Sequence, residues 1–241
     1  MRSFKAIFKK QLKDTIKNPA ILIQFIIFPI IAFVINHLVT NMYGVTEEAL
    51  ANMPNQVTMQ AGIFAGMGLI MVPMGIIAED MDKKSLRFLT MAGVKPMSYL
   101  LGISGVILVA ALCSSLAFTV IGGFTGMDFW IFLAAMMSGV VASIVLGSTF
   151  GLLAGNQQAA SALSFPAAVI IGFGPMIAQF SDDVARVMHV VYTQHFNVIA
   201  DYLNFGVSDA PLWHSFAIMW GNVAVLLVLF ALVFRRKGIV G

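Results

Sequence analysis

Charge is scarce in this sequence of 241 residues: Asp, Glu, Lys and Arg make up 10% of it, against about 25% in typical soluble domains. Hydrophobic residues reach 59%, more than a soluble core of this size requires. Apolar runs of roughly twenty uncharged residues recur at a spacing of about 30, and each is long enough to cross a bilayer. The composition therefore excludes a soluble globular protein and predicts an integral membrane protein.

Cysteine is represented only by Cys113, which lies in an apolar run. A single cysteine excludes disulfides within the chain and metal sites built from several thiolates. The sequence has no GxxxxGK[ST] motif and no polar stretch long enough to hold a nucleotide-binding domain. RNA- and DNA-binding motifs are also missing, so the net charge of +3 does not indicate a nucleic-acid partner. We therefore expect no enzymatic activity, no cofactor and no metal in this chain.

Six apolar runs predict six transmembrane helices in a single all-α domain that covers residues 1–241. Their expected ranges are 20–40, 58–78, 97–122, 129–154, 160–180 and 214–234. None of these runs contains Asp, Glu, Lys or Arg. Ion-coupled transporters usually carry an ionisable group inside the membrane, so the runs disfavour a transporter that is driven by an ion gradient.

The basic residues are distributed unevenly around these runs. With a cytoplasmic N-terminus, all of the 14 Lys and Arg residues except Arg186 lie before the first span, between the second and third, or after the sixth. The positive-inside rule therefore predicts that both termini are cytoplasmic. It also places residues 79–96 in the cytoplasm and residues 181–213 outside the cell.

Residues 4–17 predict an amphipathic elbow helix that lies on the membrane surface before the first span. A disordered basic tail, the alternative, would not require an apolar stripe at helical spacing. Asn18-Pro19 ends the segment, with Pro at a permitted first helical position. The apolar stripe consists of Phe4, Ile7, Phe8, Leu12 and Ile16, and the basic side of Lys5, Lys9, Lys10, Lys13 and Lys17.

The segment between the second and third spans is too charged to enter lipid, yet it contains apolar residues that a solvated loop does not need. Ser85 is expected to act as the N-cap of a short helix with an apolar side available for docking. A loop resting on the lipid headgroups is the alternative. The candidate docking residues are Lys83, Lys84, Ser85, Leu86, Arg87, Phe88 and Leu89.

Residues 102–105 match the GxSG motif of rhomboid-type intramembrane proteases, with Ser104 as the candidate nucleophile. The candidate bases His189, His195 and His214 fall at or beyond the outer edge, across most of a hydrocarbon core about 30 Å thick. A base must approach its nucleophile within about 3 Å, so helix packing through small residues is the better explanation. His189 and His195 would lie on different faces of one helix, which argues against a metal site.

Small residues recur every four positions in the fourth span, at Gly139, Ser143, Gly147, Gly151 and Gly155. Gly62 and Gly66 repeat this spacing in the second span. Such faces let helix backbones approach closely. We expect packing within one subunit, with a specific dimer seam as the alternative.

At the docking segment the chain resembles the permease subunits of type-2 ATP-binding cassette (ABC) exporters. The order of motifs carries this resemblance: a charged stretch, a short Ser-Leu-Arg segment, a Pro-containing turn, a Leu-Leu-Gly, a polar stretch before span five and an outer segment before span six. They occupy residues 79–84, 85–87, 95–98, 100–102, 155–159 and 175–204. With the elbow helix and six spans, the resemblance covers the whole chain. Lys84 stands where the family has Gly, and the family's proline near Gln194 is missing.

The resemblance implies a dimer, of two copies or with a paralogous permease, driven by a separate cytoplasmic ABC ATPase that binds ATP and Mg²⁺. Residues 83–89 would dock on this ATPase, and the elbow helix would rest on anionic lipid. The family implies export, and we expect a bacterial plasma membrane.

The cargo is expected to be apolar or amphipathic, such as a peptide, drug or lipid, because the spans carry no charge. A possible substrate path is formed by Gln24, Asn36, His37, Met67, Met71 and Met74. The alternative function is a membrane scaffold or immunity protein that binds a toxin or partner without transport.

Overall fold

The computed structural model describes residues 2–41, 55–206 and 211–240, and the side chains among them from Ile7 to Arg236 except Ala20. All regular structure in these residues is helical. Six segments are long and apolar enough to cross a membrane: Ile21–Thr40, Gln56–Asp82, Pro96–Ile121, Gly126–Ala154, Gln157–Ala178 and Leu212–Arg236. The prediction of an all-α membrane protein with six spans is confirmed.

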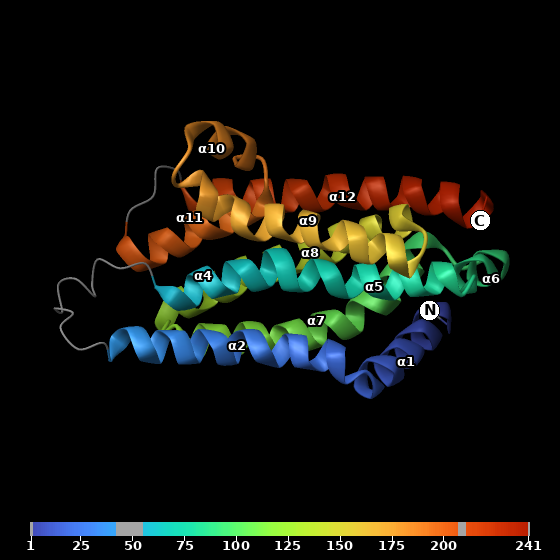
Figure 1. The fold of residues 1–241 in the computed structure, drawn as a ribbon, viewed down its shortest axis with the longest axis horizontal. Helices are drawn as coiled ribbons and strands as arrows, with labels where there is room; N and C mark the ends of the chain where they lie inside the picture. Colours follow the sequence, from blue (N-terminus) through green and yellow to red (C-terminus); the bar gives the residue numbers. More distant parts are fainter. Residues whose placement is uncertain (1, 42–54, 207–210, 241) are drawn as a thin grey trace.

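Figure 1 shows the order of the helices along the chain. A first helix precedes the first span, and the second span consists of two α-helices joined by a π-helical turn, η1. The bounds are α1 (Arg2–Lys17), α2 (Pro19–Thr40), α4 (Gln56–Ile63), η1 (Phe64–Gly68), α5 (Leu69–Asp82), α6 (Ser85–Met91), α7 (Pro96–Ile121), α8 (Gly126–Ala154), α9 (Gln157–Ala178), α10 (Asp182–Met188), α11 (Tyr192–Phe205) and α12 (Leu212–Val240).

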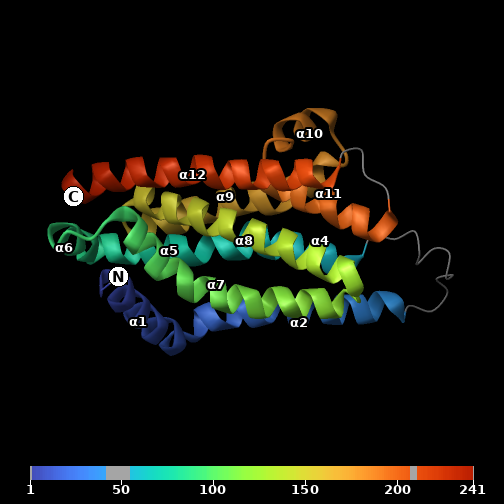
Figure 2. The same cartoon turned by 180° about the vertical axis from the view of Figure 1, so that it is seen from behind.

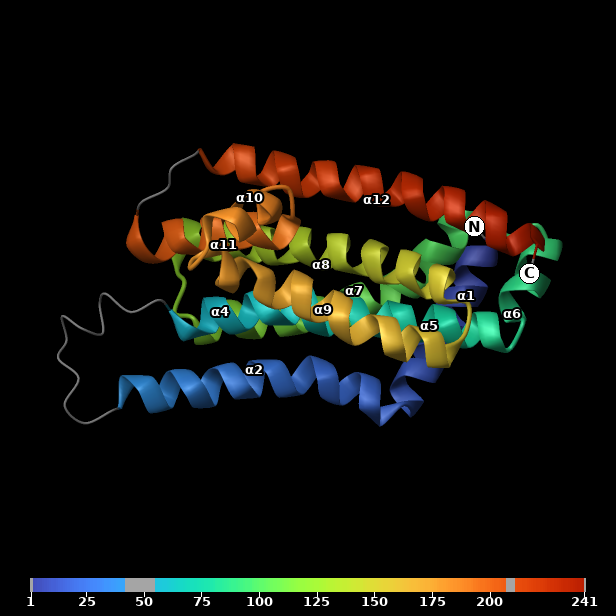
Figure 3. The same cartoon turned by 45° about the horizontal axis from the view of Figure 1, so that its top comes forward.

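The spans lie side by side in an elongated bundle. The helix α8 packs against α5, α12, α7 and α11 and so occupies the middle of the bundle (Figure 3). The start of α1, the end of α12 and the short helix α6 all lie at one end of the bundle, here named the α6 end (Figures 1 and 2). The segments that the positive-inside rule assigns to the cytoplasm therefore lie together at one end of the bundle.

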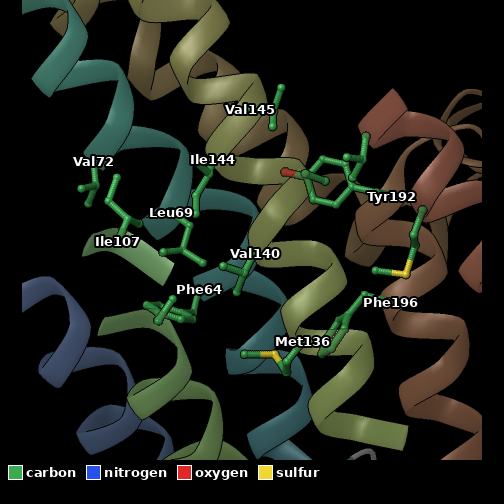
Figure 4. Packing of buried hydrophobic residues seen from close by; sticks show 14 of the residues in the cluster. Phe64, Leu69, Val72, Ile107, Met136, Val140, Ile144, Val145, Tyr192 and Phe196 are labelled. Carbon is green, nitrogen blue, oxygen red and sulfur yellow. The ribbon is translucent and has the colours of Figure 1, made fainter. Parts of the chain in front are cut away.

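Buried apolar side chains surround the middle of α8. Figure 4 shows Phe64 and Leu69 of the second span beside Val140 and Ile144 of α8, and all four are at most 1% exposed. Phe64 also lies against Phe118 of α7, with ring centroids 5.4 Å apart. This cluster joins three spans into one core.

The small residues of α8 let it touch the backbone of α5. A Cβ atom built on Gly147 would lie 2.2 Å from the Ile70 carbonyl oxygen, and one on Gly151 would lie 2.8 Å from that of Met74. The prediction of close packing within the subunit is confirmed at these two positions. Gly155 does not take part in this packing, because nothing lies within 4 Å of its Cβ position. It ends α8 in the left-handed conformation, with φ of 75°.

One expectation at the α6 end requires correction. The helix of the second span continues beyond its predicted end at residue 78, so residues 79–82 belong to α5. The short helix begins at Ser85, but the N-cap position belongs to Lys84, and no side chain caps the helix. Ser85 is therefore the first helical residue, and its expected role as N-cap is wrong.

The segment expected outside the cell contains two helices, α10 and α11, between the fifth and sixth spans. Residues 207–210 of this segment lie outside the described residues. α10 packs on α9, and α11 packs on α8 and α12. Tyr192, Phe196 and Ile199 of α11 are at most 1% exposed, so α11 is part of the bundle core.

Candidate functional site

The chain enters and leaves α6 through two residues in the left-handed conformation. Lys84, with φ of 56°, joins α5 to α6, and Gly93, with φ of 76°, follows the end of α6. This conformation costs a residue with a side chain about 1–2 kcal/mol, whereas glycine adopts it readily. Lys84 therefore carries a backbone strain that a glycine at the same position would not have.

The two faces of α6 differ in exposure. Leu86 is buried against the bundle, with 1% of its surface exposed, while Phe88 and Met91 are 69% and 75% exposed. Phe88 and Met91 are three residues apart and so share one face of the helix. Leu86 therefore anchors α6 to the bundle, while the open face carries Phe88 and Met91. Met91 lies outside the set of residues expected from the sequence.

Basic residues surround this exposed apolar face. Lys83, Lys84 and Arg87 are all exposed, as expected, and Ser85 and Leu89 are half-buried. The Lys83 ammonium donates a hydrogen bond to the Glu79 carboxylate one turn earlier. This hydrogen bond and the charge of Glu79 raise the pKa of Lys83. Because the pair is exposed, it adds little to stability.

The helix α1 crosses the end of α7 and packs against its glycines. A Cβ atom on Gly102 would lie 2.5 Å from Cγ2 of Ile7, and one on Gly105 would lie 2.9 Å from Cδ2 of Phe8. The glycines at 102 and 105 therefore make room for α1, as the packing explanation of the GxSG match expected. The hydroxyl of Ser104 is buried, and no described residue forms a hydrogen bond with it. No described histidine is therefore bonded to this candidate nucleophile.

The rest of α1 is open on the side away from α7. Leu12 and Ile16 are 41% and 62% exposed, and the expected basic residues Lys9, Lys10, Lys13 and Lys17 are also exposed. The apolar stripe expected from the sequence is thus divided between a protein-facing part and an open part. The side chains of Phe4 and Lys5 lie outside the described residues.

A buried carboxylate joins three helices at the α6 end. Asp80 of α5 is 6% exposed and accepts a hydrogen bond from the Tyr99 hydroxyl of α7 at 2.9 Å. It also forms an ion pair with Lys10 Nζ of α1 at 2.9 Å, and the Lys10 side chain is 52% exposed. Lys10 and Asp80 are 70 positions apart in sequence, and no motif or spacing predicts their contact.

A cavity of about 540 Å³ lies beside this cluster, between α1, α6 and α7. Its walls include Ile7, Phe88, Leu89 and Ile103, with Asp80 on the polar side. The cavity separates the apolar residues of α1 from those of α6. The base of α6 is therefore loosely packed toward α1, in contrast to the seam between α5 and α8.

The residues expected along a substrate path do not form one lining. Gln24 donates a hydrogen bond to the Gly68 carbonyl at 2.9 Å, so it holds α2 against η1. His37 is exposed near the end of α2 and stacks on Phe33, and Asn36 precedes it by one residue. Met67 packs beside Gly172 of α9. A Cβ atom built on Gly172 would lie 3.0 Å from the Cβ atom of Met67.

Met71 and Met74, by contrast, line a common cavity of about 320 Å³ between α5 and α9. The opposite wall is polar and is formed by Gln157, Ser161 and Ser164 of α9. Gln157 and Ser161 are exposed, although they begin a membrane-spanning helix. The hydroxyls of Ser161 and Ser164 donate hydrogen bonds to the carbonyls of Gln157 and Ser161, so the helix itself satisfies both donors. The exposed Gln157 is the first residue of the span.

The π-helical turn in the second span is held by polar side chains from two neighbours. Ser143 of α8 donates a hydrogen bond to the Ala65 carbonyl, and Gln24 holds that of Gly68. The Tyr192 hydroxyl lies 2.7 Å from the Ser143 oxygen. A π-turn frees backbone groups from the regular α-helical pattern, and these side chains satisfy two of its carbonyls. Nothing in the sequence pattern predicted this turn.

Three of the four histidines gather where α10, α11 and α12 meet. The rings of His189 and His195 are 5.5 Å apart, and those of His195 and His214 are 6.2 Å apart. The expectation that His189 and His195 lie on different faces of one helix is wrong, because the chain turns between α10 and α11. His195 donates from Nε2 to the His189 carbonyl and approaches Ser215 at 3.3 Å. Burial lowers the pKa of His195.

These histidines do not form a metal site by geometry. Within the described part of the chain, no group of three or more His, Cys, Asp or Glu side chains is arranged to hold a metal ion. His195 is satisfied by a carbonyl and a hydroxyl, as a structural histidine is. The α6 end, with its exposed apolar face and its buried carboxylate, therefore carries the clearest functional features.

Comparison with known families assigns the chain to one of them. The family described as ABC-2 family transporter protein matches residues 43–232, which is most of the chain. No curated protein sequence matches it. Permeases of this family carry no ATPase motif and imply an ATPase partner in a membrane setting. With its six apolar spans, this multi-pass membrane protein belongs to the ABC-2 family of transporter proteins, as a transmembrane permease of an ABC transporter.

Proposed function

We propose that this chain is the permease subunit of an ATP-driven exporter and that a separate cytoplasmic ATPase docks on the open face of α6. The observation that carries the proposal is the exposure of Phe88 and Met91 on a helix whose other side, at Leu86, is fixed in the bundle. Two large apolar side chains that are exposed on one helix face favour contact with another protein. Family membership favours transport over a scaffold or immunity function.

The docking chemistry follows from the residues on and around that face. Phe88 and Met91 would enter an apolar groove on the ATPase, and buried anchors of this kind supply most of the binding energy at an interface. Lys84 and Arg87 would meet acidic groups at the rim, where charges chiefly set the association rate. The left-handed residues Lys84 and Gly93 fix the direction in which the face points.

The membrane orientation supports the same assignment. α6 shares its end of the bundle with α1 and with the C-terminal end of α12 (Figure 1), and these segments carry nearly all of the basic residues. The positive-inside rule makes this end cytoplasmic, which is where an ATPase has access to ATP. The open side of α1, with Leu12, Ile16 and the exposed lysines, would rest on anionic lipid of the inner leaflet.

For the cargo, the cavity between α5 and α9 is the best supported part of a path. Met71 and Met74 provide an adaptable apolar wall, and Gln157, Ser161 and Ser164 provide hydrogen-bonding groups. This combination suits an apolar or amphipathic substrate, such as a peptide, drug or lipid, and export is the direction we propose. A second permease, identical or paralogous, would cover the exposed polar residues at the start of α9.

Copurification tests the docking proposal. The chain is tagged, co-expressed with the ABC ATPase encoded beside it, and the ATP hydrolysis retained on the resin is measured. Phe88→Asp and Met91→Asp are expected to lose most of the bound ATPase. Met127→Asp is the matched control, because Met127 is 73% exposed at the start of α8, at the opposite end of the bundle.

The control variant should retain the ATPase as the unchanged protein does. The proposal fails if the unchanged chain never retains the ATPase, or if Met91→Asp retains as much of it as Met127→Asp. Monodisperse elution of each variant on size-exclusion chromatography shows that lost binding does not reflect lost folding.

A further inference from the structure

The position of Asp80 connects α1 to α5, two helices that otherwise have little contact. α1 packs on α7 and α2, and α6 follows directly from α5. The Lys10–Asp80 ion pair joins α1 to α5 two residues before α5 ends, and the Tyr99 hydroxyl joins α7 to the same carboxylate. Lys84, the hinge into α6, follows two residues after the end of α5.

The cavity beside this cluster shows why the ion pair matters for movement. Ile7 and Gln11 of α1 and Phe88 and Leu89 of α6 line its walls, so α6 does not fill the space that separates it from α1. Direct apolar packing therefore does not connect α6 to α1, although both helices are joined to α7, α1 by packing and α6 by the chain. The charged route between them runs from α6 through the end of α5 to Asp80 and then to Lys10.

Desolvation strengthens this route. A carboxylate removed from water needs its charge partner and its hydrogen bonds, and removing one partner leaves an uncompensated charge. When the end of α5 moves, the Lys10 ammonium and the Tyr99 hydroxyl are therefore expected to follow Asp80. Lys10 itself is half exposed and has a flexible stem, so the bond can survive a small rotation.

We propose that Asp80 is a positioning residue that makes α1 move with α5 and α6 during the ATPase cycle. This inference rests on the proposed function, because the movement begins with an ATPase that acts on α6. Its consequence is that ATP binding displaces the membrane-surface helix α1, although α1 lies on the far side of a cavity from the docking face.

Distance measurements between spin labels test this inference in the complete permease–ATPase complex in lipid nanodiscs. The labels are placed at Lys13 of α1 and Val225 of α12, both exposed and away from the docking face, after Cys113→Ser removes the native thiol. Distances are recorded without nucleotide and with ATP plus vanadate. In the otherwise unchanged complex we expect the distance between the labels on α1 and α12 to change when ATP and vanadate are added.

Four further variants separate coupling from simple structural support. Lys10→Met and Asp80→Asn are expected to lose the nucleotide-dependent shift while the ATPase stays bound and hydrolyses ATP. Lys10→Arg keeps the charge and is expected to restore the shift. Lys9→Met is the matched control on the same helix and should behave as the unchanged chain.

The possible outcomes can be told apart. If the ATPase binds and hydrolyses ATP but α1 does not shift, the inference is overturned and the proposed function stands. Lys10→Met keeps Asp80 and its bond to Tyr99. If the distance between the labels changes with nucleotide in Lys10→Met as it does in Lys9→Met, the inference is also overturned and the proposed function stands. If the unchanged chain does not bind the ATPase, the proposed function and the inference both fail.

Discussion

The seam between α5 and α8 and the junction between α1, α5 and α6 are held together in opposite ways. At the seam, Gly147 and Gly151 bring backbone against backbone with no space for one added carbon. At the junction, an ion pair and one hydroxyl bridge helices beside a cavity of about 540 Å³. Close packing resists deformation, so the seam can transmit a force as a rigid unit. The junction has the space to change shape.

A larger side chain at Gly147 should break the rigid region and has the largest expected effect. In Gly147→Val the new Cβ would overlap the Ile70 carbonyl, and a backbone atom cannot rotate away as a side chain can. We expect little folded protein, measured as the yield of monodisperse protein after detergent extraction. Gly75→Ala is the control, since nothing lies within 4 Å of the Gly75 Cβ position; equal loss in both variants would contradict the account.

Shortening Leu86 tests the anchored side of α6. Leu86→Ala removes a side chain that is 1% exposed and is expected to cost about 3 kcal/mol of unfolding free energy. Phe88→Ala, on the open face, should change stability by less than about 0.5 kcal/mol. Thermal unfolding of the two variants without the ATPase measures both values. Similar losses would mean that α6 does not have one anchored and one open face.

Replacing Lys84 by Gly tests the turn into α6. Lys84→Gly removes the left-handed strain of a residue with a side chain but adds freedom to the unfolded chain, and we expect a net gain of about 0.5–1 kcal/mol. Lys95→Gly is the comparison, because Lys95 has an ordinary φ of −75° and should lose stability. Equal unfolding temperatures for the two variants would rule out strain at Lys84.

Acidification should loosen the histidine cluster at the opposite end and has the smallest expected effect. Burial lowers the pKa of His195 below its usual value near 6.5, so the unfolded state binds more protons than the folded state between the two pKa values. Stability therefore rises with pH through that window and falls as the pH drops from 7.5 toward 5.5. Thermal unfolding against pH should show a weaker pH dependence in His195→Gln than in the unchanged protein.

The spans could be predicted because their signal is local and large. A run of roughly twenty apolar residues cannot be placed anywhere but in a bilayer, and the sequence also identifies the small residues that allow α8 to approach α5. The ends of helices were less certain, since charged residues such as Asp80 and Asp82 can continue a helix beyond the apolar run. Helix propensity alone does not decide where such a helix ends.

The contacts of the candidate site could not be predicted for a different reason. Lys10 and Asp80 meet only because α1 folds back across α7, and this depends on the shape of Gly102 and Gly105. Leu86 and Phe88 are both apolar, so the sequence cannot tell which of them faces inward. His189 and His195 come together because the helix between them breaks, which no residue between them signals.

Site-specific photo-crosslinking tests most directly the claim that α6 has one anchored and one docking face. A photoreactive amino acid is introduced at position 88, 91, 86 or 127 of the chain co-expressed with its ATPase, and crosslinked partners are identified by mass spectrometry. The account predicts crosslinks to the ATPase from positions 88 and 91 and none from positions 86 and 127. Crosslinks to the ATPase from position 86 and none from positions 88 and 91 would contradict it.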